Sequence, residues 1–267
     1  MEEGLGIKNF LQATSYKLQA IIEDVQTVMW RDWVVLRRRL KKFILSRLVT
    51  PVLYLVAFGW GLGRSITPES GTYLDFLVPG IIALNTMNVS YMSATAVHGE
   101  KFYHKSLENY LAAPIEPTAF VIGKILSSVI RAFISTSLIL IIAAMFDAQL
   151  NFLLDAGRAF GFFSVIFLNS IIFAAVGFCA AMYVKTFEEL SQVNTYFLMP
   201  MSFLCGTFFS TSQLPDFVRF LIEILPLTHT SEMLRHGINF ISLTILILYA
   251  VLLIKFSCVA FKKLTAE

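Results

Sequence analysis

Charged residues are scarce in this sequence. Asp, Glu, Lys and Arg together make up 15% of the 267 residues, whereas hydrophobic residues make up 57%. A soluble domain averages about 25% charged residues, so this chain has too little polar material to cover a surface that faces water. Lipid must therefore solvate much of it. We expect a single all-α integral membrane domain, without room for a separate soluble enzyme.

The sequence also lacks the motifs of common catalytic, metal and nucleotide sites. No HExxH, GxSxG or GxGxxG is present, and Gly123–Lys124 lacks the upstream glycine of a phosphate-binding GxxxxGK[ST] loop. The three cysteines are far apart, without the CxxC spacing of a disulfide framework or metal site. We therefore predict no enzyme activity, no catalytic, cofactor-binding or metal-binding residue, and no nucleic-acid partner. The cysteines are expected to be small core residues: Cys179, Cys205 and Cys258.

Six long apolar runs dominate what is present. In hydrocarbon the backbone must satisfy its own hydrogen bonds, so runs of about 20 residues are expected to be transmembrane helices. The first 24 residues are polar and mixed, which does not fit a signal peptide. The predicted spans are residues 43–62, 76–97, 119–146, 157–184, 192–210 and 239–261.

The distribution of Lys and Arg predicts the orientation of these spans. Most of them lie in residues 1–42, 98–118, 185–191 and 262–267. The positive-inside rule places these segments, and hence both termini, in the cytoplasm. The expected organisation is a cytoplasmic N-terminus at 1–42, a six-helix domain at 43–261 and a tail at 262–267. The opposite loops contain Arg64, Arg158, Arg219 and Arg235.

The N-terminal region has a helical pattern of its own. Its apolar positions recur at helical spacing and leave most charged residues on other faces, which predicts an amphipathic helix lying in the cytoplasmic interface. Trp30 and Trp33 suit the depth of the lipid headgroups. The alternative is a simple basic flank that only orients the first span. The apolar positions are Val25, Met29, Trp33, Leu36 and Leu40.

Residues 211–238 form neither a clean span nor a simple loop. Two prolines enclose an apolar piece too short to cross a membrane, which predicts a re-entrant or interfacial element on the outer side. A second short helix at about 228–236, with Thr228 as its N-cap, is expected to follow. Because His229, Glu232 and His236 have helical spacing, we considered a metal site, but a hydrogen-bonded outer gate fits better. The candidate gate residues are Pro215, Pro226, His229, Glu232 and Arg235.

Few charges lie inside the predicted spans. Three of them are near cytoplasmic helix ends, where the side chain can extend to the interface: Arg47, Lys124 and Lys255. Arg131 lies deep in the third span, where facing lipid would cost at least ~2.5 kcal/mol, so it is expected to face the bundle or a polar cavity. A structural role and a place on the transport path both remain open. Its candidate neighbours are Asn85, Asn88 and Asn194.

Loop 98–118 has the pattern of a short amphipathic helix. Its apolar side chains recur at i, i+4, i+7 and i+8, and Pro114 and Pro117 end it before the next span. Such a helix, joined to two spans, could transmit force from a soluble partner, or it could simply rest on the membrane. The pattern alone does not separate these two interpretations. The apolar positions are Tyr103, Leu107, Tyr110 and Leu111.

A family resemblance favours the first interpretation, a helix that transmits force from a soluble partner. The segment HGEKFYHKSLENYLAAPIEPTAFVIGK (98–124) resembles the cytoplasmic signature of ABC-2 type permeases, with its Gly-Glu opening, Leu-Glu-x-x-Leu centre, Pro stop and Gly-Lys re-entry. LVPGII (77–82), KTFEELSQVNTYFLMPMSFLCGTFFS (185–210) and LPDFVRFLIEILPLTHTSEMLR (214–235) resemble other blocks of that family, in the same order. The resemblance covers the chain from about residue 25.

This resemblance implies the permease subunit of an ATP-driven ABC exporter in the bacterial inner membrane. Two membrane subunits would work with two ABC ATPase subunits, which bind the ATP and Mg. Segment 98–113 would be the coupling helix, and 211–238 would close the outer mouth. The residues that would couple to the ATPase are Glu100, Tyr103, Leu107, Glu108, Tyr110 and Leu111.

The cargo does not follow from the resemblance, because the family handles drugs, lipids and lipo-oligosaccharides. The 25 phenylalanines and few intramembrane charges favour an amphiphile. The alternative is a secondary transporter or channel working without ATP. The sequence shows neither a membrane carboxylate relay nor an inverted repeat, which argues against it.

Overall fold

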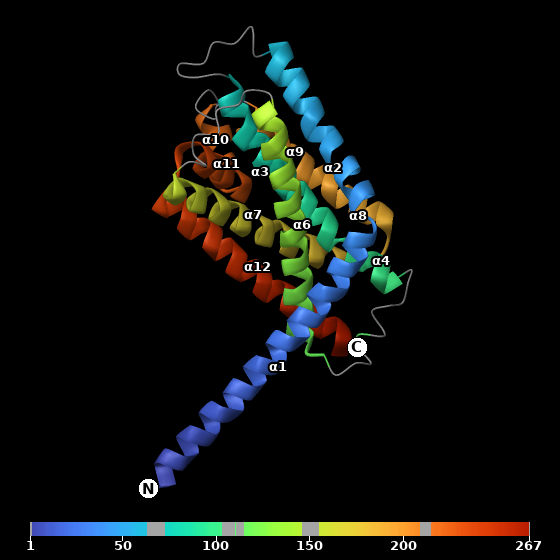
Figure 1. The fold of residues 1–267 in the computed structure, drawn as a ribbon, viewed down its shortest axis with the longest axis vertical. Helices are drawn as coiled ribbons and strands as arrows, with labels where there is room; N and C mark the ends of the chain where they lie inside the picture. Colours follow the sequence, from blue (N-terminus) through green and yellow to red (C-terminus); the bar gives the residue numbers. More distant parts are fainter. Residues whose placement is uncertain are drawn as a thin grey trace.

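The computed structural model describes residues 2–62, 73–102, 110, 115–145, 155–208 and 215–266, and every regular element in these ranges is helical. Figure 1 shows their arrangement. In chain order the elements are α1 (Glu2–Arg38), α2 (Leu40–Tyr54), the π-helical η1 (Leu55–Leu62), α3 (Tyr73–Ala94), α4 (Ala96–Phe102), α6 (Pro117–Met145), α7 (Ala156–Tyr183), α8 (Phe187–Val193), the π-helical η3 (Asn194–Leu198), α9 (Met199–Leu204), α10 (Asp216–Glu223), α11 (Pro226–His236) and α12 (Phe240–Ala266).

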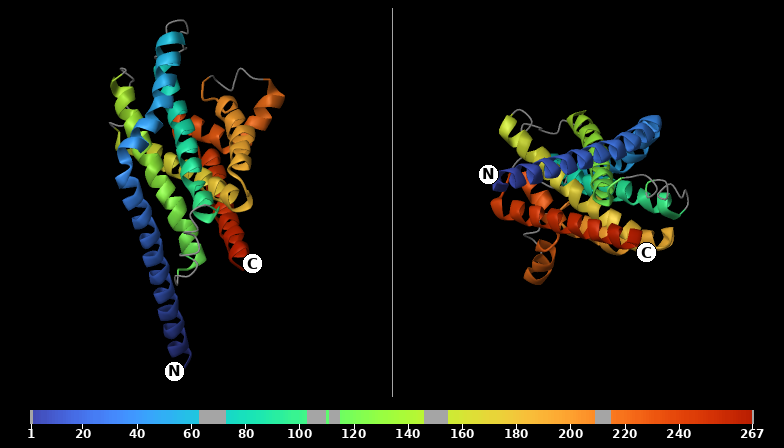
Figure 2. Two further views of the ribbon diagram at one scale, coloured as in Figure 1. Left: turned by 90° about the vertical axis from the view of Figure 1, so that its right-hand side faces the viewer. Right: turned by 90° about the horizontal axis from the view of Figure 1, so that it is seen from below.

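Four long helices make up the core. α3, α6 and α7 pack against one another, and α12 packs mainly against α7 (Figures 1 and 2). The side chains between them are apolar and fully enclosed, among them Ile81, Met87, Ile166 and Phe178. Because lipid tails are as apolar as these side chains, close packing rather than exclusion of water stabilises the contacts.

Two glycines allow helices to approach closely. A Cβ on Gly177 of α7 would lie 2.5 Å from the carbonyl oxygen of Tyr91 in α3. A Cβ on Gly123 of α6 would lie 2.8 Å from Cβ of Val28 in α1. At both crossings a larger residue would force the helices apart, so the small residues at these positions determine the spacing of the bundle.

Three helices are long and apolar enough to cross a membrane: Pro117–Met145, Ala156–Tyr183 and Phe240–Lys263. They coincide with three of the six predicted runs. Run 76–97 corresponds to α3, which is buried along most of its length. The runs 43–62 and 192–210 are each divided among two or more shorter helical segments. An all-helical membrane fold is therefore confirmed, and the six-span arrangement stays a prediction.

The first predicted run is interrupted at two points. Arg39 leaves the helical conformation, with φ −115° and ψ 13°, and separates α1 from α2. Within α2, Pro51 has no N–H to donate, and the wider π-helical turns of η1 begin four residues later. Beyond the bundle, α1 continues as a projecting rod (Figure 2).

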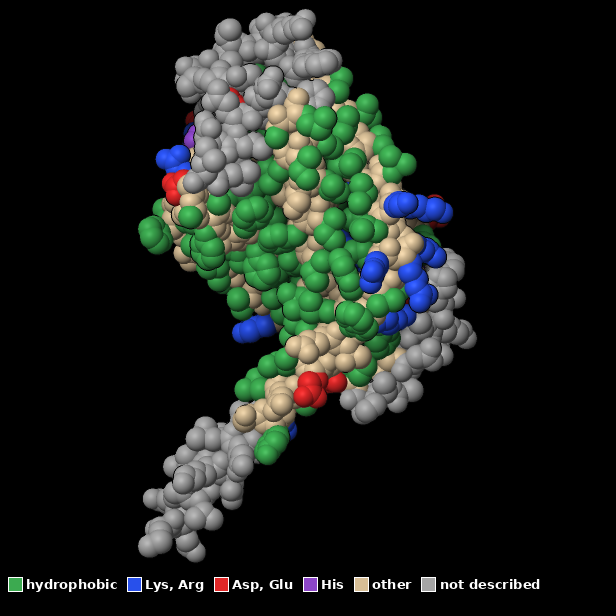
Figure 3. Space-filling view, viewed as in Figure 1, with side chains coloured by type: hydrophobic (Ala, Val, Ile, Leu, Met, Phe, Trp, Pro, Cys, Tyr) green, Lys and Arg blue, Asp and Glu red, His purple; other side chains and the backbone are tan. Residues whose placement is uncertain are grey.

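Hydrophobic side chains cover most of the bundle surface in Figure 3, whereas Lys and Arg gather mainly along one edge. Large apolar side chains are exposed on several elements, including Phe160, Phe197, Phe240 and Ile241. Such extensive apolar exposure suits contact with lipid rather than water.

Candidate functional site

A cluster of charged side chains lies where α1, α4 and α6 meet. Nζ of Lys124 in α6 is 2.9 Å from Oδ1 of Asp32 in α1 and 2.9 Å from Oε2 of Glu100 in α4. The Lys124 side chain is 5% exposed. A buried charge is tolerated only with such partners, so these three residues, the junction triad, tie together three separate segments.

The position of Lys124 corrects the sequence interpretation. Its side chain was expected to extend to the membrane interface, but it is enclosed by the junction triad and by the rings of Tyr110 and Phe120, which lie 5.8 Å and 5.6 Å from Nζ. The expectation was wrong because Asp32, its closest partner, is 92 residues away in the sequence. Position within a span could not reveal that partner.

Arg31 and Tyr110 extend the junction triad. Nη1 of Arg31 lies 3.6 Å from Oε1 of Glu100 and donates a hydrogen bond to the Tyr110 hydroxyl. The guanidinium also stacks 4.7 Å above the Tyr110 ring. Burial raises the pKa of Tyr110, so its hydroxyl stays neutral at physiological pH. The cluster therefore contains two cations, Arg31 and Lys124, and two carboxylates, Asp32 and Glu100, so its charges balance.

Further contacts hold the start of the predicted coupling segment in place. Nζ of Lys101, in α4, donates to the carbonyl oxygen of Met182 near the end of α7, at 3.0 Å. Partial burial lowers the pKa of Lys101. After the segment, the backbone N–H of Glu116 donates to Asp24 of α1, at 3.1 Å. Both ends of segment 98–113 are thus attached to helices of the bundle or to α1.

The six predicted coupling residues divide into two groups. Glu100 and Tyr110 belong to the cluster just described, and both contact Arg31. The other four lie outside the described residues, and their roles stay predictions: Tyr103, Leu107, Glu108 and Leu111.

The buried face of α1 differs from the predicted one. Val28, Asp32 and Leu36 are buried against the bundle, whereas Trp33 is exposed. Of the five positions with apolar helical spacing, Leu36 is buried, Trp33 is exposed, and Val25, Met29 and Leu40 are partly buried. The apolar periodicity did not show the buried face because a buried Asp, paired with Lys124, occupies the middle of it.

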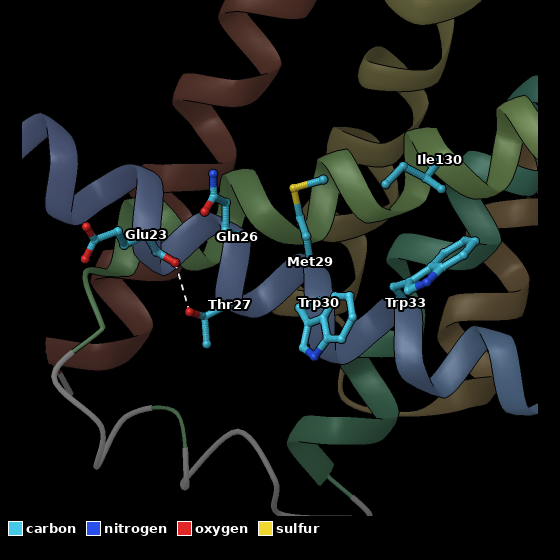
Figure 4. A pocket seen from close by; sticks show the side chains of 7 residues that line it. All are labelled: Glu23, Gln26, Thr27, Met29, Trp30, Trp33 and Ile130. Atoms are coloured by element: carbon cyan, nitrogen blue, oxygen red, sulfur yellow. Dashed lines mark hydrogen bonds between the residues drawn. The ribbon is translucent and has the colours of Figure 1, made fainter.

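A shallow groove of about 690 Å³ runs along α1 where it lies beside α6. Figure 4 shows Trp30 and Trp33 of α1 beside it, together with Ile130 of α6. Trp30 is 68% exposed, which suits the headgroup depth proposed from the sequence. The lining residues are Glu23, Gln26, Thr27, Met29, Trp30, Trp33 and Ile130.

A second cavity, which we call the polar cleft, has a volume of about 430 Å³ and lies between α2, α3 and the η3–α9 segment. It brings together the three asparagines singled out in the sequence, Asn85, Asn88 and Asn194. Nδ2 of Asn85 donates to Ser135 of α6 at 2.8 Å, and Nδ2 of Asn88 donates to the Leu84 carbonyl at 3.0 Å. The lining residues are Ser46, Arg47, Thr50, Pro51, Tyr54, Ile81, Leu84, Asn85, Asn88, Val89, Met92, Asn194 and Met199.

The arginine in the polar cleft is Arg47, not Arg131. Arg131 instead lines a small crevice beside α1, together with Asp32 and Ser127. The prediction that Arg131 faces the asparagines was wrong, because Arg131 lies on the side of α6 next to α1. Arg47 had been assigned to the interface, and the tilt of α2 against α3 places it in the cleft.

At the opposite end of the bundle, Arg235 fixes α11 to its neighbours. Its Nε donates to the Phe76 carbonyl and its Nη2 to the Thr207 carbonyl, both at 3.0 Å. The guanidinium also stacks 3.8 Å above the Phe76 ring. Gly80 leaves room for this arrangement, since a Cβ there would lie 2.6 Å from Arg235 Nη2.

The segment before the last helix contains two short helices, α10 and α11, and the second begins earlier than the sequence suggested. Pro226 occupies its first turn, and Leu225 stands at the N-cap. Thr228 is not the N-cap: its hydroxyl donates to the Ile222 carbonyl at 2.7 Å. Proline in the first turn is a stronger start signal, because its missing N–H would be unpaired there anyway.

The other candidate gate residues have different environments. Nδ1 of His229 lies 3.1 Å from Ser242 Oγ and Nε2 lies 2.8 Å from the Glu223 carbonyl, so both ring nitrogens are occupied. Glu232 and Pro215 are exposed. Within the described ranges, no group of three or more His, Cys, Asp or Glu side chains could hold a metal ion.

Long apolar helices, a charged junction and a polar cleft within the membrane part define a membrane transport component rather than a catalytic subunit. The chain belongs to the ABC-2 type transporter family, whose model matches residues 23–239. This finding confirms the resemblance read from the sequence blocks.

Individual relatives agree with this assignment. The chain is 28% identical over 219 residues to the inner membrane transport permease YadH of Escherichia coli (strain K12), covering 77% of this chain and 83% of that protein. It is 26% identical over 213 residues to nodulation protein J of Bradyrhizobium diazoefficiens, covering 78% and 79%. Nodulation protein J of Sinorhizobium fredii is 28% identical over 211 residues, covering 78% of each.

Proposed function

We propose that two copies of this chain form the membrane part of an exporter driven by two separate ABC ATPase subunits. ATP and Mg bind to those partners, and this chain carries an amphiphilic cargo such as a drug, lipid or lipo-oligosaccharide out of the cytoplasm or inner leaflet. The complex lies in the bacterial inner membrane, with both termini in the cytoplasm. The name of YadH, an inner membrane transport permease, supports this location.

The junction triad is the observation that carries the proposal. Glu100 lies near the start of the segment expected to contact the ATPase, and Lys124 lies in the first part of α6, a helix long enough to cross the membrane. Asp32 joins both of them to α1. A movement of segment 98–113 caused by the ATPase is therefore transmitted through the junction triad to α6 and α1. A helix bundle with two stable arrangements can convert such a local change into a rearrangement of its helices.

Reconstitution with the native ATPase subunits tests the proposal. The wild-type complex should hydrolyse ATP faster with amphiphile present and move a fluorescent amphiphile across proteoliposomes only when ATP is supplied. Transport by this chain alone, without ATP, would instead establish the alternative of a channel or secondary transporter.

Glu100→Gln tests the part played by the junction triad. The variant should insert and bind the ATPase but lose most amphiphile-stimulated hydrolysis, because Lys124 keeps only Asp32. Glu188→Gln, an exposed carboxylate on α8, is the matched control and should behave like wild type. Equal activity of both variants would remove the junction triad from the mechanism.

A further inference from the structure

Arg47 carries an unneutralised charge inside the polar cleft. The cleft lining contains no Asp or Glu, and Arg47 forms no ion pair within 4.0 Å among the described residues. Its side chain is half-buried. A guanidinium removed from water in this way favours an anion as its partner.

A second cation strengthens this preference. The charge of Arg131 on α6 lies close enough to repel that of Arg47. Arg131 also forms no ion pair within 4.0 Å in the described part of the chain, and Asp32, which shares its crevice, is bound to Lys124. Two neighbouring cations, neither of them in an ion pair among the described residues, create a positive potential that an incoming anion would relieve.

The polar cleft is polar at one end and apolar at the other. α2 rises from the end of the bundle that holds the junction triad, and α3 returns toward it. Ser46 and Arg47 of α2 and Asn194 therefore lie at the triad end, where Val89 and Met92 of α3 form the apolar part of the wall. Farther along, the lining consists of Pro51, Tyr54, Ile81 and Leu84, with Asn85 and Asn88 between the two ends. If the triad end faces the cytoplasm, an inner-leaflet amphiphile would enter with its headgroup beside Arg47.

The rim can also accommodate a lipid chain. Met92 and Met199 line the polar cleft and are 45% and 56% exposed. Methionine side chains are flexible and polarisable, so they adapt to acyl chains of different shape. Each asparagine amide has two N–H groups, and among the described residues Asn85 and Asn88 each donate one hydrogen bond from theirs.

From this arrangement we infer that the polar cleft binds the anionic headgroup of an amphiphile, with Arg47 as the charge-selecting residue. The headgroup is a phosphate, sulfate or carboxylate, which a guanidinium can bind through two parallel hydrogen bonds. Asn88 and Asn194 are placed to donate to its remaining oxygens. This inference rests on the proposed function and names the chemical class of its cargo.

Binding to the full-length chain, purified in neutral detergent, tests the inference. The probes are dodecyl phosphate and dodecyl glucoside, which share one chain length and differ in headgroup charge. Wild type should bind dodecyl phosphate at least tenfold more tightly, and Arg47→Gln should remove that difference. Arg47→Lys should keep part of it, because an ammonium retains the charge but not the paired hydrogen bonds.

Lys42→Gln is the matched control, since Lys42 is an exposed cation of the same helix and does not line the polar cleft. It should leave the preference unchanged. Equal loss in both variants would mean diffuse attraction by surface charge and would overturn the inference, as would equal affinity of wild type for the two probes. Inorganic phosphate at millimolar concentration should not displace dodecyl phosphate; full displacement would indicate a site for free anions.

A second variant covers the case in which Arg47→Gln does not fold. Asn194→Asp places a carboxylate in the polar cleft as an internal counter-ion, and it should lower affinity for dodecyl phosphate at least tenfold without affecting dodecyl glucoside. Unchanged affinity would contradict the inference. Because binding needs neither ATP nor transport, a negative result here leaves the proposed exporter function standing, and failure of ATP-driven transport leaves this test intact.

Discussion

At the scale of single residues, the Gly-Lys pair at 123–124 shows how two adjacent side chains can serve different contacts. Gly123 makes room for Val28 of α1, and Lys124 bonds Asp32, one helical turn further along α1. In a different context, the same dipeptide would suggest a phosphate-binding loop. Here it fixes the position of α1 on α6 through one steric and one electrostatic contact.

Replacing Lys124 by Met should destabilise the protein strongly. The change leaves the buried Asp32 without its cation and Glu100 with Arg31 alone, and breaking a buried pair in this way costs about 3–5 kcal/mol. The midpoint of thermal unfolding in detergent should fall well below that of Lys255→Met, which removes an exposed lysine.

The triple variant Lys124→Met/Asp32→Asn/Glu100→Gln should recover part of this loss, because it removes the uncompensated charges as well. A triple variant less stable than Lys124→Met would show that the energetic cost does not arise from those carboxylates.

Arg235→Lys should weaken the attachment of α11. Lysine cannot stack its head flat on the Phe76 ring while donating to two carbonyls, so about 1–3 kcal/mol of stability should be lost. Thermal unfolding measures the effect. Arg219→Lys, which alters an exposed i,i+4 pair with Glu223 on α10, should change stability by less than about 0.5 kcal/mol.

The sequence pointed to some of these residues and missed others. Glu100 and Tyr110 stood out because they belong to a recognisable loop, and three asparagines stood out as polar residues within apolar runs. Asp32 did not, because its importance depends on Lys124, 92 residues away in the chain. Arg47 was assigned to the interface, because the sequence alone does not show the cleft that it lines. One signal was available: Asp32 is an isolated acid beside the basic stretch of residues 37–42, and such an acid often has a buried partner.

At the scale of elements, long uninterrupted helices were predicted within a few residues and interrupted ones were not. The run 157–184 corresponds to α7, Ala156–Tyr183, because hydrophobicity and length both specify it. The run 192–210 corresponds to α8, η3 and α9 in part, since Pro200 and the change to π-helical turns divide it. Apolar composition predicts where a chain can cross a membrane, but not how its helical turns are wound.

Helix crossings provide a prediction at this scale. Gly123→Ala should lower thermal stability because the new methyl group overlaps Cβ and Cγ1 of Val28, and Val28→Gly in the same chain, which removes both atoms, should restore part of it. Gly61→Ala is the control: a Cβ there meets nothing within 4 Å, so the change should be neutral or slightly stabilising.

Gly177→Ala should not be rescued in this way. Its clash is with the backbone oxygen of Tyr91, which no side-chain substitution can remove. Recovery of Gly177→Ala by Tyr91→Ala would contradict the close crossing of α3 and α7.

At the scale of the whole molecule, the orientation in the membrane is open to a direct measurement. Single cysteines at Ser70 and Ser212, in a background without the three natural ones, should react with an impermeant thiol reagent applied outside intact cells. A cysteine at Ser106 should react only after the cells are opened. Labelling of Ser106 from outside would reverse the proposed topology.

The projection of α1 beyond the bundle has a mechanical consequence. The helix is in contact with α6 at Val28, and roughly 26 residues lie between that point and its first turn, a length of about 40 Å at 1.5 Å per residue. If α1 rotates about its contact with Gly123, a tilt of about 10° moves its first turn by roughly 7 Å. Spin labels at the exposed Ser15, halfway along this length, and at Ser137 would register about half of that movement as a change in distance when ATPase subunits bind.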